Sequence, residues 1–247
     1  MSGENNSPFK FLDAYTEKDR EVFFGRDDEI EELYKLLYET NLILVYGPSG
    51  TGKTSLIQCG LASKFSKTDW FDIHVRRKDD LNASLRRELR KKMRTKIDEE
   101  ETDVVQLMES LFLDFFVPIT LIFDQFEELY ILGSGEERKT FIQDVSRLIK
   151  SDVNCRLIFV MREEYIAQLY DFEKVVSSLF EKRMRIEPMS ITNVRKVITG
   201  SAEAYNITLE EGDETVNKLI EQISDRKSGI QLSYLQIYLD KLYREAS

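Results

Sequence analysis

The sequence predicts an α/β fold, a three-layer αβα arrangement in which helices cover both faces of a five-stranded parallel sheet, followed by a small helical lid subdomain. Three observations support this prediction. Short apolar runs alternate with helical patterns, a glycine-rich loop separates the first apolar run from the next helix, and the pattern after Pro188 is purely helical. We therefore expect an N-terminal lead over residues 1–26, a core over residues 27–188 and the lid over residues 189–247.

The first elements alternate as a parallel sheet requires. After an extended lead, apolar side chains of residues 27–39 share one face of a predicted helix. Residues 41–47, NLILVYG, form a short β-rich run that predicts the first strand. Residues 54–65 continue as a helix, and residues 70–76, WFDIHVR, are the second expected strand.

The same alternation continues to the end of the core. Two helices are expected within residues 82–115. Residues 118–124, PITLIFD, are uniformly apolar up to the final Asp, as a central parallel strand should be. A helix over residues 137–151 then separates this strand from expected strands at residues 155–161 and 183–189.

The lid is predicted from two helical stripes of apolar side chains. One stripe comprises Val216, Leu219, Ile220 and Ile223, and the other Leu232, Leu235, Leu239 and Leu242. The chain stops inside this helical pattern. We therefore expect either a protein that ends there or the front part of a longer one.

Composition narrows the class of protein. The 247 residues carry a formal net charge of −10, and phosphate contacts with nucleic acid need clustered Lys and Arg, so a generic nucleic-acid binder is disfavoured. No run of 18 apolar residues occurs and no secretory pattern opens the chain, so we expect a cytoplasmic protein that does not enter a membrane. Cys59 and Cys155 lack a CxxC spacing and are expected to be reduced core residues. The single histidine, His74, cannot build a His-rich metal site.

One basic segment departs from the acidic composition. Residues 84–96, SLRRELRKKMRTK, predict a basic helix, and the acidic run at residues 98–103 follows it directly. Most such runs are solvated faces, and here the acidic run offsets the charge. The other interpretation is a contact for a partner or for nucleic acid, and both stay open at this point.

The stretch GPSGTGKT fits the pattern G-x-x-x-x-G-K-[ST] without a mismatch. It follows a predicted strand and opens a predicted helix, which is the context expected of a phosphate-binding loop. Its backbone N–H groups would surround the phosphates, Lys53 would reach the β and γ phosphates, and the Thr54 hydroxyl would bind Mg²⁺. The expected nucleotide-binding residues of this loop are Gly47, Pro48, Ser49, Gly50, Thr51, Gly52, Lys53, Thr54 and Ser55.

Acidic side chains follow the third predicted strand in ITLIFDQFEELY. Asp124 ends the strand, where a carboxylate can hold the water shell of Mg²⁺. Glu127 or Glu128 can orient or deprotonate the attacking water, and we favour Glu127. The alternative is that both glutamates are exposed charges at a helix start, where acids are favourable.

Two further elements are candidates for contacts with the nucleotide. Arg162 follows the fourth strand directly, and in an α/β sheet the carboxyl ends of the strands face the ligand. It can therefore sense the γ-phosphate, or it can pair with a neighbouring glutamate. Phe24, Gly25 and Arg26 precede the first helix, and could lie against a nucleotide base or serve as ordinary core at a helix start.

Together these motifs resemble the STAND class of P-loop NTPases within the broader AAA+ fold, most closely the bacterial novel STAND type. The resemblance extends over nearly the whole chain. Its main motifs are VFFGRDDEIEEL, GPSGTGKTSL, LIFDQFEELY and FVMREEY, and the D-Q-F-E-E pattern is the most specific. The resemblance implies that Arg26 contacts the adenine side of the nucleotide. In the similar stretch GIQLSYLQIYLDKLY, this sequence has Ser233 where the family carries a proline near the base.

The resemblance implies a switch that holds ADP at rest and exchanges it for ATP, with Mg²⁺, slow hydrolysis and a role in bacterial signalling or defence. Protein partners or self-assembly on activation are expected from the same resemblance. The alternative is an AAA+ ATPase that acts on DNA or protein clients, which would need a basic channel. A scaffold that binds nucleotide without turnover, and a phosphotransferase, are the remaining candidates.

Overall fold

The computed structural model describes residues 9–66, 68–96, 103–223 and 230–246. By internal packing the chain divides into two compact units, each made of separate stretches of sequence. One unit contains the five-stranded sheet and comprises Leu33–Gly47 and Phe65–Arg185. The other contains the phosphate-loop residues from Pro48 onward and the C-terminal helices; it comprises Met1–Glu32, Pro48–Lys64 and Ile186–Ser247. The predicted boundaries at residues 26 and 188 stay predictions.

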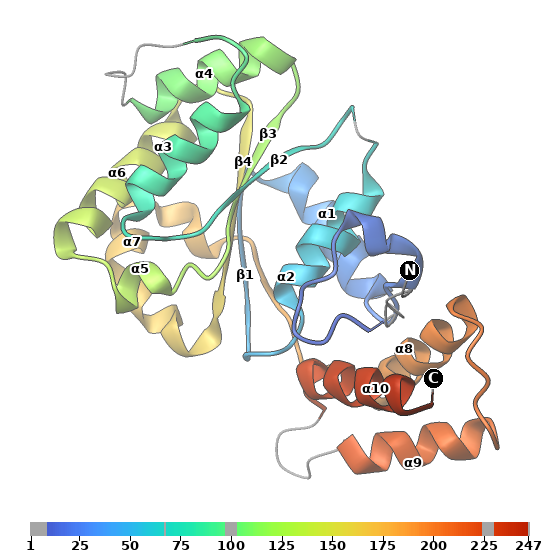
Figure 1. Ribbon diagram of the computed structural model, residues 1–247. Helices are drawn as coiled ribbons and strands as arrows, with labels where there is room; N and C mark the ends of the chain where they lie inside the picture. The colour runs from blue at the N-terminus through green and yellow to red at the C-terminus, as the bar shows by residue number, and fades with distance from the viewer. Residues whose placement is uncertain (1–8, 67, 97–102, 224–229, 247) are drawn as a thin grey trace. The chain divides into compact units, whose positions relative to one another are not determined.

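All five strands of the sheet unit are parallel, and their order is β2-β3-β4-β1-β5 (Figure 1). This confirms the predicted α/β class with a five-stranded parallel sheet. The strands are Leu42–Gly47 (β1), Phe71–Val75 (β2), Ile119–Phe123 (β3), Cys155–Arg162 (β4) and Arg183–Arg185 (β5). Every residue of β3 is buried, as expected for a central strand that is covered on both faces.

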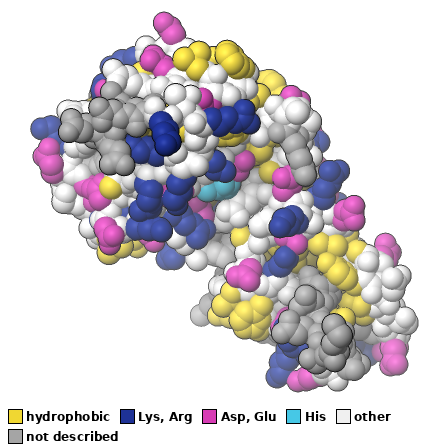
Figure 2. Space-filling model, turned by 45° about the horizontal axis from the view of Figure 1, so that its top comes forward, with side chains coloured by type: hydrophobic (Ala, Val, Ile, Leu, Met, Phe, Trp, Pro, Cys, Tyr) yellow, Lys and Arg dark blue, Asp and Glu magenta, His cyan; other side chains and the backbone are white. Residues whose placement is uncertain are grey.

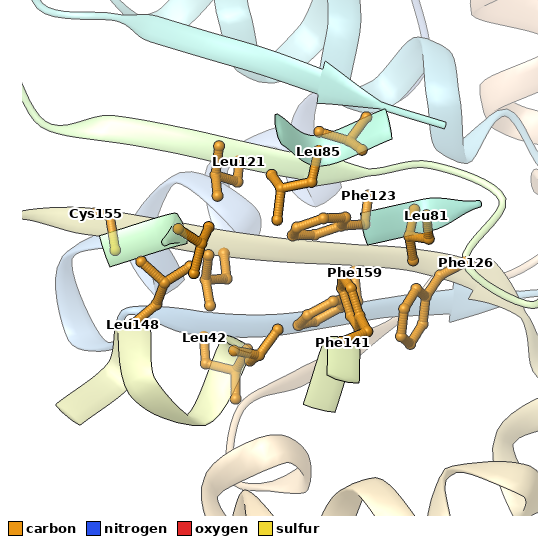
Figure 3. Close-up of a cluster of buried hydrophobic side chains, with 14 of the residues drawn as sticks. Leu42, Leu81, Leu85, Leu121, Phe123, Phe126, Phe141, Leu148, Cys155 and Phe159 are labelled. Carbon is orange, nitrogen blue, oxygen red and sulfur yellow. The ribbon is translucent and has the colours of Figure 1, made fainter. Parts of the chain in front are cut away.

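The flanking elements of this unit pack around a core rich in phenylalanine. They are α3 (Leu81–Lys92), α4 (Val104–Phe115), α5 (Glu128–Ile131), α6 (Gly135–Lys150), η4 (Glu163–Leu169), α7 (Tyr170–Val175) and η5 (Ser177–Phe180). Figure 3 shows Phe123, Phe126, Phe141 and Phe159 gathered beside leucines of the same cluster. The ring centroids of Phe126 and Phe159 are 4.5 Å apart, so the turn after β3 is anchored in the core.

The second unit joins the N-terminal lead, the phosphate loop and the C-terminal helices. Its elements are η1 (Glu17–Val22), the first half of α1 (Asp27–Glu39), α2 (Lys53–Ser55), η2 (Leu56–Leu61), η3 (Ala62–Lys64), α8 (Ile191–Ala204), α9 (Asp213–Ile223) and α10 (Leu232–Ala246). We call α8, α9 and α10 the lid helices. Val194, Ile220 and Leu235, one from each lid helix, are buried in one apolar cluster, which Phe9 of the lead also joins. The purely helical pattern expected after Pro188 is therefore confirmed, and a separate lid subdomain stays a prediction.

Three elements differ in detail from the sequence-based expectation. The lead is not wholly extended, because Asp19 accepts a hydrogen bond from the Thr16 N–H (2.8 Å) and caps the 3₁₀ helix η1. The helix expected over residues 54–65 begins as α2, but continues as the π-helical stretch η2 and the 3₁₀ turn η3. The strand expected over residues 183–189 is only three residues long, and Pro188, which has no N–H, lies beyond its end.

Other expectations concern single residues and the membrane. Cys59 and Cys155 are free and buried, and burial raises the pKa of the Cys59 thiol to about 12 and that of Cys155 to about 11. Within the described ranges, no helix combines the length and the apolar character needed to cross a membrane.

Candidate nucleotide site

Glycine conformations and side-chain donors shape the phosphate loop. Gly50 and Gly52 have φ angles of 76° and 83°, a left-handed region that favours glycine. The Pro48 carbonyl accepts hydrogen bonds from Lys53 Nζ (2.7 Å) and from Thr51 Oγ1 (3.0 Å). Two side chains of the loop therefore bind a carbonyl of the same loop, and this contact holds the Lys53 ammonium group against the loop backbone.

Arg26 is the buried charge behind this loop. The residue is only 3% exposed, and its Nη2 donates to the carbonyls of Thr51 (2.8 Å) and Glu187 (3.0 Å). Its Nη1 pairs with the carboxylate of Glu29. One guanidinium therefore joins the phosphate loop to the residue that precedes Pro188, where the chain enters the lid helices.

Phe24 and Gly25, the other two residues expected on the base side, pack against the lid helix α8. A Cβ on Gly25 would lie 2.7 Å from the Asn193 carbonyl oxygen, so a larger residue does not fit there. A Cβ on Gly200 would lie 2.8 Å from the ring of Phe24. The Phe-Gly-Arg element is therefore fixed by contacts on both sides, with the loop through Arg26 and with α8 through Phe24.

Ser233, in the first turn of α10, also lies beside the loop. A Cβ on Gly50 would be 3.4 Å from Ser233 Oγ, and a Cβ on Gly52 would be 3.2 Å from Leu232 Cδ1. The sequence stretch that lacks the expected proline thus supplies a hydroxyl next to a phosphate-loop glycine.

Tyr15 connects the lead to both sides of the same region. Its N–H donates to Ser55 Oγ (3.1 Å), directly after the loop, and its hydroxyl donates to Gln236 Oε1 (2.8 Å) on α10. The Lys10 N–H donates to the same Gln236 oxygen (3.2 Å). Burial raises the pKa of Tyr15, so its hydroxyl remains a donor.

The acidic part of the predicted site lies in the sheet unit, at the ends of neighbouring strands. Asp124 follows β3 and is 4% exposed, and its N–H donates to the Val75 carbonyl at the end of β2 (3.1 Å). Its Oδ2 accepts hydrogen bonds from Arg76 Nε (3.0 Å) and from Arg76 Nη2. Its Oδ1 accepts from the Gln125 N–H (3.1 Å).

Glu127 and Arg162 are brought together in the same unit. The Nε of Arg162 is 3.3 Å from Glu127 Oε1, and the Arg162 N–H donates to Glu127 Oε2 (3.3 Å). Glu127 is buried, whereas Glu128 is half-buried at the start of α5. Of the two candidate glutamates, Glu127 is therefore the one that contacts the predicted sensor arginine.

Arg77 is the neighbour of Arg76 but has a different partner. Its Nε and Nη2 bind the two oxygens of Glu137 at 2.9 Å each, a bidentate pair in which Arg77 is only 10% exposed. Burial works to raise the pKa of Glu137, but hydrogen bonds from Arg77 and from the Leu81 N–H outweigh it and hold the pKa below its usual value. This pair ties the end of β2 to α6.

Arg76 is the contact that sequence reasoning missed. It follows β2 directly, and Arg162 is the last residue of β4. The position of Arg76 at the end of a predicted strand could therefore have marked it as a candidate site residue. Its partner Asp124 could be assigned only once β2 and β3 were known to be neighbours, with Val75 opposite Phe123.

The chemistry of the predicted donors fits a nucleotide with a divalent cation. A threonine hydroxyl and an aspartate carboxylate are hard oxygen ligands of the kind that Mg²⁺ prefers, and Lys53 supplies a cation for phosphate. Within the part of the chain that the structure describes, no three His, Cys, Asp or Glu side chains gather into a metal site. The residues that the sequence predicts for Mg²⁺ are Thr54 and Asp124, and this assignment stays a prediction.

The basic segment at residues 84–96 corresponds to α3 and the residues after it. Figure 2 shows Lys and Arg side chains gathered beside the single histidine. Several have partners: Lys91 lies 2.9 Å from Glu88, and Arg94 lies 4.3 Å from the Phe115 ring centroid. Of the acidic run, residues 98–102 lie outside the described residues.

Comparisons with known proteins agree with this architecture. The family model Novel STAND NTPase 1 matches residues 8–247. A search of curated proteins found no match. Among solved structures, the Walker-type ATPase PABY2304 of Pyrococcus abyssi is similar over 98% of this chain and 73% of that chain, with a TM-score of 0.68 and 16% identity.

Two further solved structures are similar over most of this chain. The ORC2 protein of Aeropyrum pernix in its ADP form has a TM-score of 0.70 and 14% identity, over 97% of this chain and 68% of that one. Domain III of the replication initiation protein DnaA from Thermotoga maritima has a TM-score of 0.59 and 18% identity, over 94% of this chain and 89% of that one. At such identities the likeness shows the fold alone.

Proposed function

The chain belongs to the Novel STAND NTPase 1 family, and from this premise we propose that it binds ATP and ADP and acts as a nucleotide-dependent switch with slow Mg²⁺-dependent hydrolysis. The phosphate loop supplies the binding chemistry. Lys53 and the loop N–H groups hold the phosphates, and Thr54 and Asp124 hold Mg²⁺. The bound ion would neutralise charge on the phosphates.

Hydrolysis is assigned to Glu127 and its control to Arg162. Glu127 orients or deprotonates the attacking water, and Arg162 contacts the γ-phosphate. The ion pair between them supports this assignment, because an arginine drawn toward a phosphate loosens its hold on the glutamate. ADP lacks the γ-phosphate, so the Glu127–Arg162 pair persists with ADP.

The observation that carries the switch proposal is the position of Arg26. Its guanidinium binds the carbonyl of Thr51 in the phosphate loop and the carbonyl of Glu187 at the entry to the lid helices. A ligand shifts a conformational equilibrium only through contacts that differ between states. A change in the loop on exchange of ADP for ATP would reach the lid helices through this buried side chain.

The biological setting is part of the same proposal. We place the switch in the cytoplasm, in bacterial signalling or defence, with protein partners or self-assembly on activation. The family membership supports this setting. The lid helices would be the part that presents the nucleotide state to such partners.

The proposal is tested by identifying the nucleotide that the purified protein carries. The chain is purified without added nucleotide and denatured, and the released nucleotide is identified by chromatography beside a Lys53→Ala variant. We expect close to one ADP per chain in the wild type and none in the variant, with turnover well below one per second. An empty wild-type protein that hydrolyses ATP readily would contradict the resting-state switch.

That contrary result would favour the second candidate, an AAA+ ATPase acting on DNA or a protein client. The observation that supports it is the gathering of Lys and Arg side chains around α3 (Figure 2). Its test is DNA binding at increasing salt. Binding that weakens with salt and disappears when Arg90, Lys91 and Lys92 are neutralised together would support this candidate.

A further inference from the structure

Three arginines at the ends of β2 and β4 each hold one buried carboxylate, and one of the three differs from the other two. Arg77 binds both oxygens of Glu137, and Arg162 binds Glu127 through its side chain and its backbone. Arg76 instead directs two side-chain donors to a single oxygen of Asp124.

The three arginines also differ in the exposed fraction of their side chains. Arg77 is 10% exposed and is fixed between β2 and α6, so displacing it would break a buried pair. Arg76 is 50% exposed, while its partner Asp124 is 4% exposed. The arginine head can therefore move into solvent, whereas the carboxylate cannot. Of the two members of this pair, only Arg76 is displaceable.

A guanidinium and a hydrated Mg²⁺ make opposite demands on the same carboxylate. Mg²⁺ and its water shell need the oxygen lone pairs and negative charge of Asp124. Arg76 uses two hydrogen bonds on Oδ2 and neutralises the charge, and a guanidinium has no acceptor to offer a metal-bound water. Two cations at one carboxylate also repel each other. Arg76 and Mg²⁺ are thus competing partners.

We propose that Arg76 is a positioning residue that competes with Mg²⁺ for Asp124 and thereby sets the Mg²⁺ concentration at which the protein holds nucleotide in its Mg²⁺-bound form. The inference rests on the proposed function, because it assigns Asp124 to the Mg²⁺ site of a nucleotide-binding protein. The Arg76–Asp124 contact raises the Mg²⁺ concentration that the Mg²⁺-bound form needs, and loss of that contact lowers it.

The test is a Mg²⁺ titration of nucleotide binding that does not depend on turnover. The full 247-residue chain is mixed with a fluorescent ADP analogue in EDTA, and free Mg²⁺ is then raised while the bound fraction is recorded. The proteins compared are the wild type, Arg76→Gln, Arg76→Lys and the matched control Lys78→Gln, which removes an exposed positive charge two residues along the chain. Thermal unfolding of each variant confirms that it is folded.

We expect Arg76→Gln to lower the half-maximal Mg²⁺ concentration about tenfold, the size of effect that a charge-assisted hydrogen bond provides. Arg76→Lys retains the charge but loses the forked contact. Its half-maximal Mg²⁺ concentration should therefore lie between those of the wild type and of Arg76→Gln. Lys78→Gln leaves the midpoint at the wild-type value. In an Asp124→Asn background, the Arg76→Gln substitution has no further effect, because the group for which the cations compete is gone.

The outcomes separate this inference from the proposed function. A midpoint that is unchanged or raised in Arg76→Gln overturns the inference while nucleotide binding stands. A shift that persists in the Asp124→Asn background, or that Lys78→Gln reproduces, also overturns it, since the effect would then be general charge. A wild-type chain that binds no nucleotide at any Mg²⁺ concentration overturns the proposed function and the inference with it.

Discussion

At the scale of single residues, some side chains of the predicted site are fixed by protein contacts, whereas others can respond to a ligand. Arg26 is fixed: it is buried and uses its guanidinium on Glu29, Thr51 and Glu187. Lys53 and Ser233 are half-buried beside the phosphate loop, and Lys53 Nζ donates to the Pro48 carbonyl. The sequence predicted that all three lie near the nucleotide, which stays a prediction, but it could not show that carbonyl groups of the protein itself hold Arg26.

Replacing Arg26 by alanine should cost about 2–4 kcal/mol of unfolding free energy. The substitution leaves two carbonyls and one carboxylate without their donor, and unpaired buried polar groups are costly. Urea unfolding followed by circular dichroism measures the change. Arg20→Ala is the matched control, because Arg20 is exposed at the end of η1, and it should stay within about 0.5 kcal/mol of the wild type. If both substitutions lowered the free energy of unfolding equally, Arg26 would have no special structural role.

At the scale of elements, periodicity predicted most of the helices and strands because their apolar residues are buried on the expected faces. Phe141, Val145 and Leu148 of α6 all lie in the core, as the helical spacing indicated. The π-helical stretch η2 was not foreseen. Apolar spacing alone does not register the close approach at Gly60, where a Cβ would come within 2.7 Å of Ile30.

When alanine replaces a glycine inside a helix, helix propensity and packing can change the stability in opposite directions. Alanine is preferred over glycine within a helix by about 1 kcal/mol, so Gly200→Ala in α8 should stabilise on propensity alone. A Cβ there would lie 2.8 Å from the Phe24 ring, and we expect overpacking to prevail with a net loss of about 1–2 kcal/mol.

The control for this prediction is Gly135→Ala at the start of α6, where the nearest group to an added Cβ is the flexible Arg138 head at 4.0 Å. It should leave the stability unchanged or raise it by up to about 1 kcal/mol. Thermal melts of both variants measure the two changes in stability. Stabilisation by Gly200→Ala would mean that Phe24 does not pack against α8.

At the scale of the whole molecule, sequence reasoning predicted a five-stranded parallel sheet but not the order of its strands. Apolar runs show that strands exist, whereas the order β2-β3-β4-β1-β5 depends on how the connections cross the sheet. The Arg76–Asp124 pair could not be predicted for that reason, because it depends on β2 and β3 being neighbours. The grouping of the lead, the phosphate loop and the lid helices in one compact unit was also not foreseen, because those segments are far apart in the sequence.

This grouping is the physical basis of the switch proposal. Tyr15 binds Ser55 and Gln236, and Arg26 binds Thr51 and Glu187, so contacts from the loop reach both the lead and the lid helices within one unit. We therefore expect a change in the loop to alter the lead and the lid helices as well.

The most direct test of the switch is amide hydrogen exchange of the full chain, saturated with ADP or with a non-hydrolysable ATP analogue. We predict that the Tyr15 amide, which donates to Ser55, and the amides of α8 and α10 exchange at different rates in the two states. Lys53→Ala should show no difference. Identical exchange in the lead and the lid helices, with both nucleotides demonstrably bound, would contradict the claim that this protein is a nucleotide-dependent switch.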